Sequence, residues 1–432
     1  MGDVSFELKY GKGSVQFTLP EKQVQEVIQG VSYPAIDNVQ AAARQALNHP
    51  IASPPLREVV KEGDKVVVLV SDITRGWQKM HLVLPVMLEE LNAGGVADKD
   101  VTIIIAIGGH RKNTEAEFKE LCGEEIYKRV KIVNHDSRDK DNMVYLGKTS
   151  RGTEVSVSRT VAEADKVVMT GGVIYHYMVG YGGGRKSILP GIAALETIQQ
   201  NHLHALNKEV GTGSNPMSNS KITKGNAAHE DMMEIAAFVQ PDFLINMVPN
   251  TDGDYAGIFT GNWVAAWQEA TNLVDQIYGI SIKNKSDIVI ATCGGYPKDI
   301  NLYQTGKTMD NASYAVKEGG VVIILSECPD IMEPKEFTGW FNFGSLLEME
   351  KGLRANFTIP GWCAFRELEC NLTAKYILLT KSENAEFVKK TGMTPATTIE
   401  EALELALKHC NTDNPTYTVM PQGANTLPLL KE

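Results

Sequence analysis

The sequence predicts an α/β protein built from two doubly wound, Rossmann-like domains, with the active site in the cleft between them. Three observations lead to this prediction. Short apolar runs alternate along the chain with segments whose apolar residues recur at helical spacing, the pattern of parallel sheets covered by helices. The length of 432 residues is sufficient for two domains of ordinary size. Polar and glycine-rich segments directly follow several apolar runs, at the strand ends where open α/β sheets bind ligands.

Individual strands and helices follow from these patterns. The apolar runs with the length and composition of strands buried on both faces are Lys65–Val70, Val101–Ile107, Lys166–Met169, Phe243–Met247, Asp287–Ala291, Gly320–Leu325 and Lys375–Leu379. The segments with the apolar period of helices packed on a sheet are Met80–Asn92, Thr114–Cys122, Ala227–Val239, Trp263–Ile277 and Ile399–His409.

A boundary between the two domains is expected near Tyr278–Lys285, where a helical pattern gives way to the polar stretch Ser281–Ser286. The predicted domains therefore span residues 1–280 and 281–432. The stretch Gly211–Gly225 is rich in Gly, Ser, Asn and Lys, and we predict that it is a mobile surface loop.

Composition excludes several classes of protein. The net charge of −11 argues against general binding of nucleic acid, which needs a cationic surface. No apolar run reaches the roughly 20 residues that span a bilayer, and the polar start of the chain does not look like a signal peptide. The six cysteines form no CxxC pair, which favours reduced, buried thiols. The sequence thus predicts a cytoplasmic protein without a membrane partner.

Residues that can take part in catalysis or ligand binding follow the first two predicted strands. Asp72, Thr74 and Arg75 come after one strand, and Arg75 suits a carboxylate or phosphate. A helix cap with a surface ion pair explains the same residues equally well. His110 follows the next strand after two glycines, and histidine suits proton transfer near neutral pH. His135 is better explained as a structural, hydrogen-bonded histidine.

The segment from His176 to Ser187 is the densest in reactive residues, with a glycine run between His176 and Lys186. Glycines expose backbone amides to anions, and a lysine after them can act as a charge or a nucleophile. The run GGGRKS superficially resembles a P-loop, but Arg185 stands where that motif needs glycine.

Three further groups of residues complete the candidates. His202 and His204 are two residues apart, so on a helix they face different ways. Gln304 and Lys307 lie one helical turn apart and can grip a carboxylate, although an exposed helix start is an equal alternative. The remaining histidines are predicted to be solvent-facing or capping residues: His49, His81, His229 and His409.

Taken together, these residues resemble the nickel-pincer lactate racemase family. The similarity covers most of the chain, and its pieces occur in the expected order. Its most specific part is His176–Gly191 with His202 at a set distance. The other matching pieces are Ser71–Arg75, Gly108–Arg111, Glu196–Ile198 and Tyr296–Lys307.

The resemblance implies a cofactor, the nickel(II) complex of pyridinium-3,5-bisthiocarboxylate mononucleotide, called the nickel-pincer nucleotide. Lys186 matches the lysine that binds this cofactor covalently, and His202 matches the protein ligand of nickel. The loop along the nucleotide is matched by Asp72, Ile73, Thr74 and Arg75. The domain 1–280 then carries the cofactor.

The resemblance also implies the reaction. The chain is expected to be an isomerase that interconverts the enantiomers of a 2-hydroxy acid by reversible hydride transfer to the cofactor. His110 and His176 match the two histidines that accept and donate the hydroxyl proton. The substrate-binding matches are Arg75, Gln304, Lys307 and Trp362. The expected partners are the small-molecule substrate and the enzymes that make the cofactor.

The substrate and the class of function stay open at this stage. Lactate or a similar short-chain acid is favoured, since malate needs a further cation, for which Arg111 is a weak candidate, and a sugar acid needs a more polar pocket than one with Trp77. Gly76, Gly109 and the apparent insertion Gly211–Gly225 depart from the family pattern. The alternatives are a P-loop-like nucleotide hydrolase and a non-catalytic carrier of the nickel cofactor.

Overall fold

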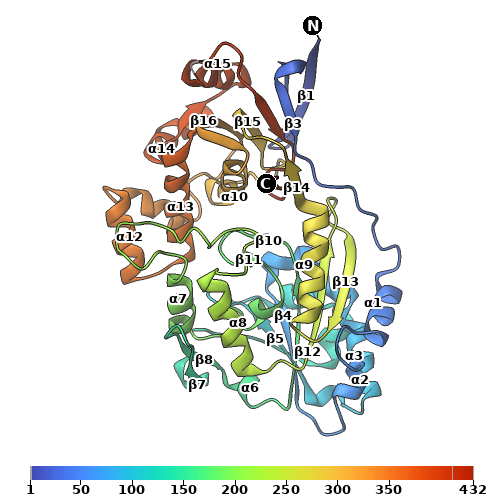
Figure 1. Ribbon diagram of the computed structural model, residues 1–432. Helices are drawn as coiled ribbons and strands as arrows, with labels where there is room; N and C mark the ends of the chain where they lie inside the picture. The colour runs from blue at the N-terminus through green and yellow to red at the C-terminus, as the bar shows by residue number, and fades with distance from the viewer. Residues whose placement is uncertain (1, 411, 432) are drawn as a thin grey trace. The chain divides into compact units, whose positions relative to one another are not determined.

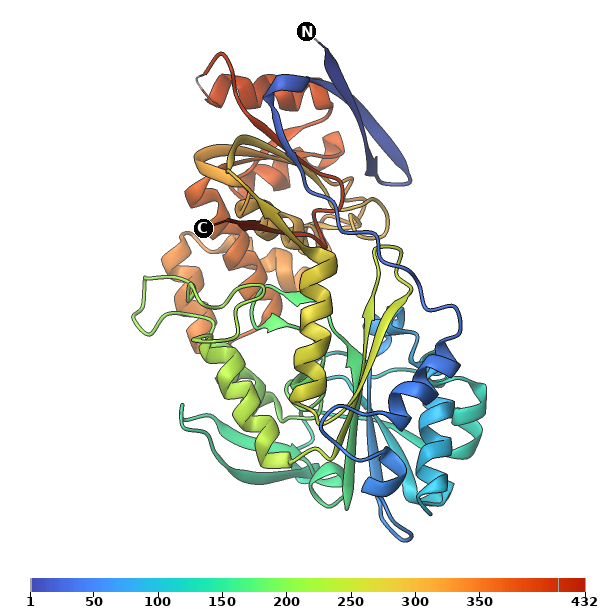
Figure 2. The same ribbon diagram turned by 45° about the vertical axis from the view of Figure 1, so that its right-hand side comes forward.

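The computed structural model describes residues 2–410 and 412–431, which form two compact units (Figures 1 and 2). Unit 1 consists of the described residues of Met1–Val31, Asn207–Ser214 and Tyr278–Glu432, and unit 2 of Ser32–Leu206 and Asn215–Ile277. Within the described part of the chain, no helix has the length and apolar character needed to cross a membrane.

Unit 2 is built on a six-stranded sheet in the order β13-β12-β9-β4-β5-β6, in which only β13 is antiparallel to its neighbour. The chain extends the sheet from β4 in one direction through β5 and β6, and then continues from β9 in the other. The strands are β4 (Val66–Ser71), β5 (Val101–Ala106), β6 (Lys131–Asn134), β9 (Lys166–Gly172), β12 (Phe243–Pro249) and β13 (Tyr255–Gly261).

Both faces of this sheet are covered, because alternate residues of its central strand are all apolar. Val66, Val68 and Val70 of β4 point into a core shared with the first five helices, whereas Val67 and Leu69 point to the other face and are equally buried. The helices of unit 2 are α1 (Val39–Asn48), α2 (Leu56–Val59), α3 (Leu84–Ala93), α4 (Glu115–Cys122), α5 (Glu124–Arg129), α6 (Arg159–Ala162), α7 (Leu195–Leu203), α8 (Ala227–Val239) and α9 (Ala265–Tyr278).

Two short antiparallel hairpins complete unit 2. One is formed by β7 (Met143–Lys148) and β8 (Glu154–Ser158), and the other by β10 (Tyr175–His176) and β11 (Gly180–Tyr181). Short 3-10 turns occur in both units: η1 (Glu21–Gln23), η2 (Ile73–Gln78), η3 (Met80–Leu82), η4 (Asp98–Asp100), η5 (Lys140–Asn142), η6 (Gly184–Ser187), η7 (Gly339–Asn342) and η8 (Ser382–Asn384).

Unit 1 has a six-stranded, fully parallel sheet in the order β18-β17-β16-β15-β19-β3. Its strands are β3 (Val24–Val27), β15 (Ser286–Thr292), β16 (Val316–Leu325), β17 (Lys375–Leu379), β18 (Thr394–Ala396) and β19 (Tyr417–Met420). Its helices are α10 (Leu302–Ser313), α11 (Lys335–Thr338), α12 (Leu346–Ala355), α13 (Ile359–Thr373), α14 (Ala385–Lys390) and α15 (Ile399–Cys410). Two smaller strand pairs are β1 (Asp3–Tyr10) with β2 (Gly13–Pro20) and β14 (Gly279–Ile282) with β20 (Leu427–Leu430).

The α/β prediction is confirmed, and strands occur at all of the predicted runs. The predicted helix Met80–Asn92 is shorter, because the α-helix begins at Leu84 with a proline in its first turn and a 3-10 turn precedes it. The segment Gly211–Gly225 contains no helix or strand, but the amides of Gly211 and Gly213 donate to the Glu350 carboxylate.

The two units divide the chain differently from the predicted ranges 1–280 and 281–432. Residues 2–31 belong to the same unit as the C-terminal part, because β3 pairs with β19 over Tyr417–Val419. Residues 207–214 belong there too, held by hydrogen bonds such as those to Glu350. The change of unit near Tyr278 lies within the predicted boundary.

Candidate active site

Three loops of unit 2 leave the carboxyl ends of the neighbouring strands β9, β4 and β5. The loop after β4 carries Asp72 to Arg75, the loop after β5 carries His110, and the chain after β9 leads into the hairpin that carries His176. From β4 the chain adds β5 and β6 on one side and later β9 on the other, so the strand order reverses between β4 and β9. Open α/β sheets bind ligands at such a switch point. Unit 2 thus gathers most of the predicted site residues at the carboxyl ends of the central strands of its sheet.

Asp72 and His110 form a hydrogen-bonded pair across this edge. Oδ2 of Asp72 lies 2.6 Å from Nδ1 of His110, and Oδ1 accepts from the backbone amide of Thr74 at 2.8 Å. Burial by itself would raise the pKa of the Asp72 carboxyl, but the bonds from His110 and Thr74 and the charge of Arg75 lower it below its ordinary value. The carboxylate is therefore an acceptor to which Nδ1 of His110 donates, and Nε2 is the ring nitrogen that Asp72 does not engage.

His176 is held differently. It lies partly buried in β10, and its Nδ1 accepts from the backbone amide of Met178 at 3.2 Å. Burial, followed by the charges of Lys186, Arg75 and Arg185, holds its pKa well below the ordinary histidine value. The ring is neutral at physiological pH, with its hydrogen on Nε2. Nδ1 of His176 thus accepts a hydrogen bond from the backbone, whereas Nδ1 of His110 lies against a carboxylate.

The hairpin that carries His176 is fixed by one carboxylate. The hydroxyls of Tyr175 and Tyr181 both donate to Oδ1 of Asp275 at 2.7 Å, and Nζ of Lys221 lies 2.6 Å from Oδ2. Tyr175 and Tyr181 are paired across β10 and β11, directly next to the pair formed by His176 and Gly180. Asp275 on α9 therefore clamps both strands of this hairpin.

The glycine run that follows forms a tight turn which only glycine fits. Gly183 and Gly184 have φ values of 66° and 53°, and an added Cβ atom would lie 2.7 Å from Val173 and Trp267 respectively. The amide of Gly184 donates to Oδ1 of Asn246 at 3.0 Å. This amide is therefore engaged within the protein, and the segment continues into a four-residue 3-10 turn where a P-loop would lead into an α-helix.

Arg185 is a buried cation whose hydrogen bonds to backbone carbonyl oxygens stabilise this turn. Its guanidinium donates to the carbonyl oxygens of Val179, Gly182 and Gly183 at 2.8 to 3.3 Å and lies 4.4 Å from the ring centre of Trp267. It also donates to Nδ1 of His229 at 3.0 Å. Burial lowers the pKa of Arg185 to about 9, so the side chain stays charged at pH 7.

His229 corrects a prediction, because it is neither solvent-facing nor a cap. It is buried, its ring stacks on Trp267 at a centroid distance of 5.5 Å, and it accepts from Arg185. The helix cap at this position is Asn226, whose side chain accepts from the His229 amide. His135, in contrast, is the expected structural histidine: it is buried, and Nε2 lies 3.0 Å from the Ala193 carbonyl oxygen.

Lys186 is a partly buried amine in a cationic neighbourhood. Burial, with the charges of Arg75 and Arg185, holds its pKa well below the ordinary lysine value. A neutral lysine amine is a nucleophile, whereas an ammonium is not. The pKa of the neighbouring His176 is lowered by the same two arginines, so the field at this edge of the sheet is positive and suits an anion.

His202 lies on α7 with 3% of its surface exposed. Burial is the main cause that lowers its pKa to about 3, and its ring has a hydrogen bond with the backbone of Ile198. Neutral imidazole is the form that binds metals. His204 faces another way, toward Thr153 and Asp231, as the two-residue spacing predicted. In residues 2–410 and 412–431, no three His, Cys, Asp or Glu side chains are grouped to hold a metal by themselves.

The remaining predicted residues lie in unit 1. Gln304 and Lys307 are on α10, where Nζ of Lys307 donates to Oε1 of Gln304 at 2.7 Å. Trp362 lies fully buried on α13. The helix α10 begins at Leu302 because the side chain of Asn301 caps it.

Several supporting residues were missed by the sequence interpretation: Asn246, Trp267, His229, Asp231 and Asp275. Each lies on α8, α9 or β12, far along the chain from the residue it holds. Asn246 stands out in the sequence as a polar residue inside an apolar strand, and this was a usable signal. The others had no local signal.

Comparison with known proteins gives consistent matches over the whole chain. A family model described as the lactate racemase N-terminal domain matches residues 10–213, and one described as the lactate racemase C-terminal domain matches residues 282–427. A lactate racemase of Thermoanaerobacterium thermosaccharolyticum is 32% identical over 430 residues, which cover 98% of this chain and 99% of that protein. A lactate racemase of Lactiplantibacillus plantarum is 29% identical over 441 residues, with coverage of 98% and 99%.

Solved structures agree with these matches. The lactate racemase apoprotein from Thermoanaerobacterium thermosaccharolyticum has a TM-score of 0.89 and 31% identity, covering 99% of this chain and all of that one. A protein from Thermotoga maritima has a TM-score of 0.63 at 17% identity, covering 92% of this chain, and this likeness concerns the fold alone. From the family models and the sequence identity, we conclude that this chain belongs to the lactate racemase family of isomerases.

Proposed function

We propose that this chain is a racemase that interconverts the enantiomers at C2 of a short-chain 2-hydroxy acid, lactate foremost, with a nickel-pincer nucleotide as cofactor. The observation that carries the proposal is the set of groups at one edge of the unit 2 sheet. It combines an imidazole paired with a carboxylate, a second imidazole, and a lysine amine whose pKa is held low by burial and by arginine charges. The relatives described above are lactate racemases.

The residues present fit the proposed cofactor. A nucleotide with thiocarboxylate arms is anionic, and the arginine charges at Arg75 and Arg185 make this region positive. Lys186, whose pKa is held low, would hold the cofactor at this site. The neutral, buried imidazole of His202 would serve as the protein ligand of the nickel. Asp72 to Arg75 would lie along the nucleotide, with Arg75 available for a negatively charged group.

The chain's own groups supply positioning and proton transfer. When bound, the cofactor supplies the hydride acceptor and donor that lets C2 lose and regain its configuration without a carbanion. We assign acceptance of the substrate hydroxyl proton to Nε2 of His110. Asp72 stabilises the imidazolium that forms and holds the ring in this tautomer, as a buried carboxylate does in hydrolase triads.

Two proton-transfer groups are needed because the two enantiomers present their hydroxyl groups in different directions. We assign the second role to His176. In the described structure its Nε2 carries the hydrogen, so it must exchange its hydrogen bond with Met178 before it accepts a proton at Nδ1, or change tautomer to accept one at Nε2. The proposed substrate-binding residues Arg75, Gln304 and Lys307, with Trp362, would hold the carboxylate and shield the keto acid.

The ion pair of Arg111 with Glu117 favours a monocarboxylate substrate over a dicarboxylate substrate. Its two terminal nitrogens pair with both carboxylate oxygens of Glu117, at 2.9 and 2.5 Å. The weak candidate for a second carboxylate-binding cation is therefore already neutralised. This supports lactate over malate.

The test uses the chain produced together with the cofactor-making enzymes, so that it is loaded. Single stereoisomers of lactate, malate, 2-hydroxybutyrate and gluconate are incubated with it, and inversion at C2 is followed by chiral chromatography, which for gluconate detects the C2 epimer. We expect lactate and 2-hydroxybutyrate to lose optical purity and malate to keep it. Loaded protein that racemises none of the four would contradict the proposal and would favour a carrier of the cofactor. Magnesium-dependent ATP hydrolysis, which we expect to be absent, would favour the nucleotide hydrolase.

A further inference from the structure

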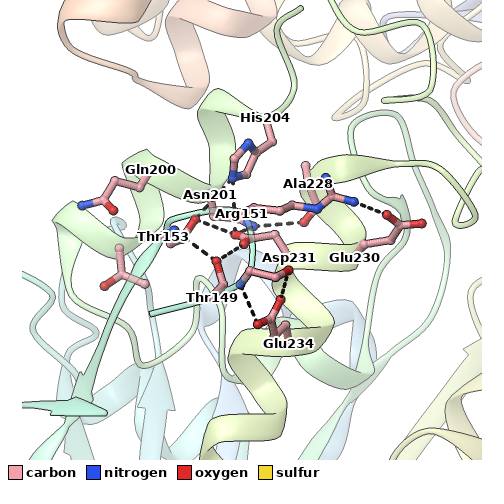
Figure 3. A network of polar contacts seen from close by, with 12 residues as sticks. Thr149, Arg151, Thr153, Gln200, Asn201, His204, Ala228, Glu230, Asp231 and Glu234 are labelled. Atoms are coloured by element: carbon pink, nitrogen blue, oxygen red, sulfur yellow. Dashed lines mark hydrogen bonds and ion pairs between the residues drawn. The ribbon is translucent and has the colours of Figure 1, made fainter. Parts of the chain in front are cut away.

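A buried carboxylate lies behind the helix that carries His202. Asp231 on α8 is fully buried, and its oxygens accept hydrogen bonds from Oγ1 of Thr149 at 2.6 Å, Oγ1 of Thr153 at 2.8 Å and Nδ2 of Asn201 at 2.9 Å (Figure 3). Nε2 of His204 lies 3.7 Å away. A buried carboxylate is costly unless donors surround it, and these groups come from two separate segments, the turn between β7 and β8 and the end of α7.

Two of the four contacts of Asp231 are with residues at the C-terminal end of α7. Asn201 lies in the last turn of α7 and His204, three residues further on, is its C-cap in helical conformation, so both side chains lie on one side of the helix end. The side-chain amide of Asn201 also donates to the carbonyl oxygen of Ala228 at 3.0 Å, which ties α7 to the first turn of α8. His202 lies between these two residues in sequence. The rotation of α7 about its axis, and with it the direction of the His202 ring, is therefore set by contacts that His202 does not make itself.

The sensitivity of a metal ligand to such a rotation is high. A rotation of about 10° moves a side-chain atom at the rim of a helix by roughly 1 Å. Metal–ligand bonds tolerate only a few tenths of an ångström. Even a small loosening of α7 therefore matters for coordination while it leaves the fold intact.

The turn between β7 and β8 supplies the other two hydrogen bonds to Asp231. Thr149 and Thr153 flank the turn between β7 and β8, and the amide of Thr153 donates to Oγ1 of Thr149 at 3.0 Å. The same turn has a second attachment to α8, in which the amide and hydroxyl of Ser150 both donate to Glu234 at 2.7 Å. This outer attachment is exposed and does not involve α7, so Glu234 offers a matched control.

We propose that Asp231 is a positioning residue for the metal ligand: it holds α7 in the rotation that presents His202 to nickel. The inference rests on the proposed function, in which His202 binds the nickel of the cofactor. Asp231 touches neither substrate nor metal in this proposal, and acts through Asn201 and His204.

The experiment measures nickel retention rather than turnover. Wild type, Asp231→Asn, Asn201→Ala, Glu234→Gln and His202→Ala are each produced with the cofactor-making enzymes. Native mass spectrometry gives cofactor and nickel per chain, and the rate of nickel release to EDTA is followed by the absorption of the bound cofactor. Asn201→Ala is included because it leaves Asp231 its threonine donors, so it is the milder change if Asp231→Asn folds poorly.

We expect Asp231→Asn and Asn201→Ala to keep the covalently bound cofactor mass on Lys186 but to release nickel about 10- to 100-fold faster than wild type, the usual cost of losing an outer support of a metal ligand. Glu234→Gln should release nickel at the wild-type rate. Equal rates for wild type and both inner variants would overturn the inference, and so would an equal acceleration in Glu234→Gln, which would mean general loosening of the turn.

His202→Ala separates this inference from the proposed function. If His202→Ala loses nickel while the Asp231 and Asn201 variants keep it, the inference alone fails. If His202→Ala retains nickel as wild type does, the assignment of His202 as ligand fails, and the inference fails with it.

Discussion

Nδ1 of His110 lies 2.6 Å from Oδ2 of Asp72, although the two residues are 38 positions apart in the sequence. The neighbouring parallel strands β4 and β5 bring their carboxyl ends together and so create this pair. Asp72 was predicted from the sequence as a residue beside the cofactor. Its position also gives it a role in holding the tautomer and the charge of a proposed proton-transfer group.

Replacing Asp72 by asparagine tests this role. The amide nitrogen would donate toward Nδ1, so the His110 hydrogen would move to Nε2 and the ring would no longer accept a proton there. We expect kcat for racemisation to fall about 10²- to 10⁴-fold, with the loaded cofactor retained. Steady-state kinetics at matched cofactor content measure this effect. A fall in cofactor content that accounts for the whole loss would instead favour a role for Asp72 in binding alone.

Removal of either histidine should abolish racemisation. His110→Ala and His176→Ala each take away one of the two proposed proton-transfer groups, and neither removes a proposed cofactor anchor. We expect nickel and cofactor content to stay near the wild-type values while lactate racemisation is lost. Chiral chromatography and metal analysis on the same samples provide the two measurements. Unchanged turnover in either variant would refute its assignment.

The depressed pKa of Lys186 predicts a pH-dependent cost to the stability of the cofactor-free protein. The folded pKa lies below the unfolded value of about 10.4, so the unfolded chain binds more protons and stability rises with pH between the two values. Lys186→Met has no such cost. We expect cofactor-free Lys186→Met to melt at a higher temperature than wild type at pH 7.

The difference between these two proteins should shrink as the pH approaches 10, with a slope of at most about 1.4 kcal/mol per pH unit. Thermal unfolding of both proteins across this range, in the absence of the cofactor-making enzymes, measures it. A constant difference over the range would mean that packing alone distinguishes the two side chains. Lys208→Met, in an exposed segment, serves as the control.

For Glu367 on α13 we expect the opposite pH dependence, in which the folded protein loses stability as the pH rises. Its carboxyl is 2% exposed, burial holds its pKa well above the ordinary value, and an added Cβ on Gly306 of α10 would lie 2.5 Å from its Oε1. A raised folded pKa means that stability is full below the unfolded pKa of about 4.3 and falls as the pH rises toward the folded value. Glu367→Gln lacks this loss.

We therefore expect Glu367→Gln to gain stability relative to wild type as the pH rises from 4.5 to 8, by a growing difference in melting temperature. The exposed Glu400→Gln on α15 should show no such trend. If the difference for Glu367→Gln stays flat with pH, the carboxyl is ionised in the folded protein and has a partner that neutralises it.

Much of the fold was predictable because it depends on local pattern. The apolar runs of β4, β5 and β12 are buried on both faces and contain β-branched residues, and such runs have few alternatives to a central strand. The helices α10 and α13 were not predicted, because their buried faces contain polar residues such as Thr305, Asp310 and Glu367 that blur the apolar period.

The sequence by itself determined the strands, the glycine turn before Lys186 and the identity of the reactive side chains, since these depend on neighbours within a few residues. Only the tertiary structure decided that Asp72 pairs with His110, that His229 is buried under Trp267, and that Asp231 holds the helix of His202. It also decided that β3 joins the sheet of the C-terminal part. The physical reason is that each of these contacts joins segments far apart in the chain, and their meeting depends on how whole strands and helices pack.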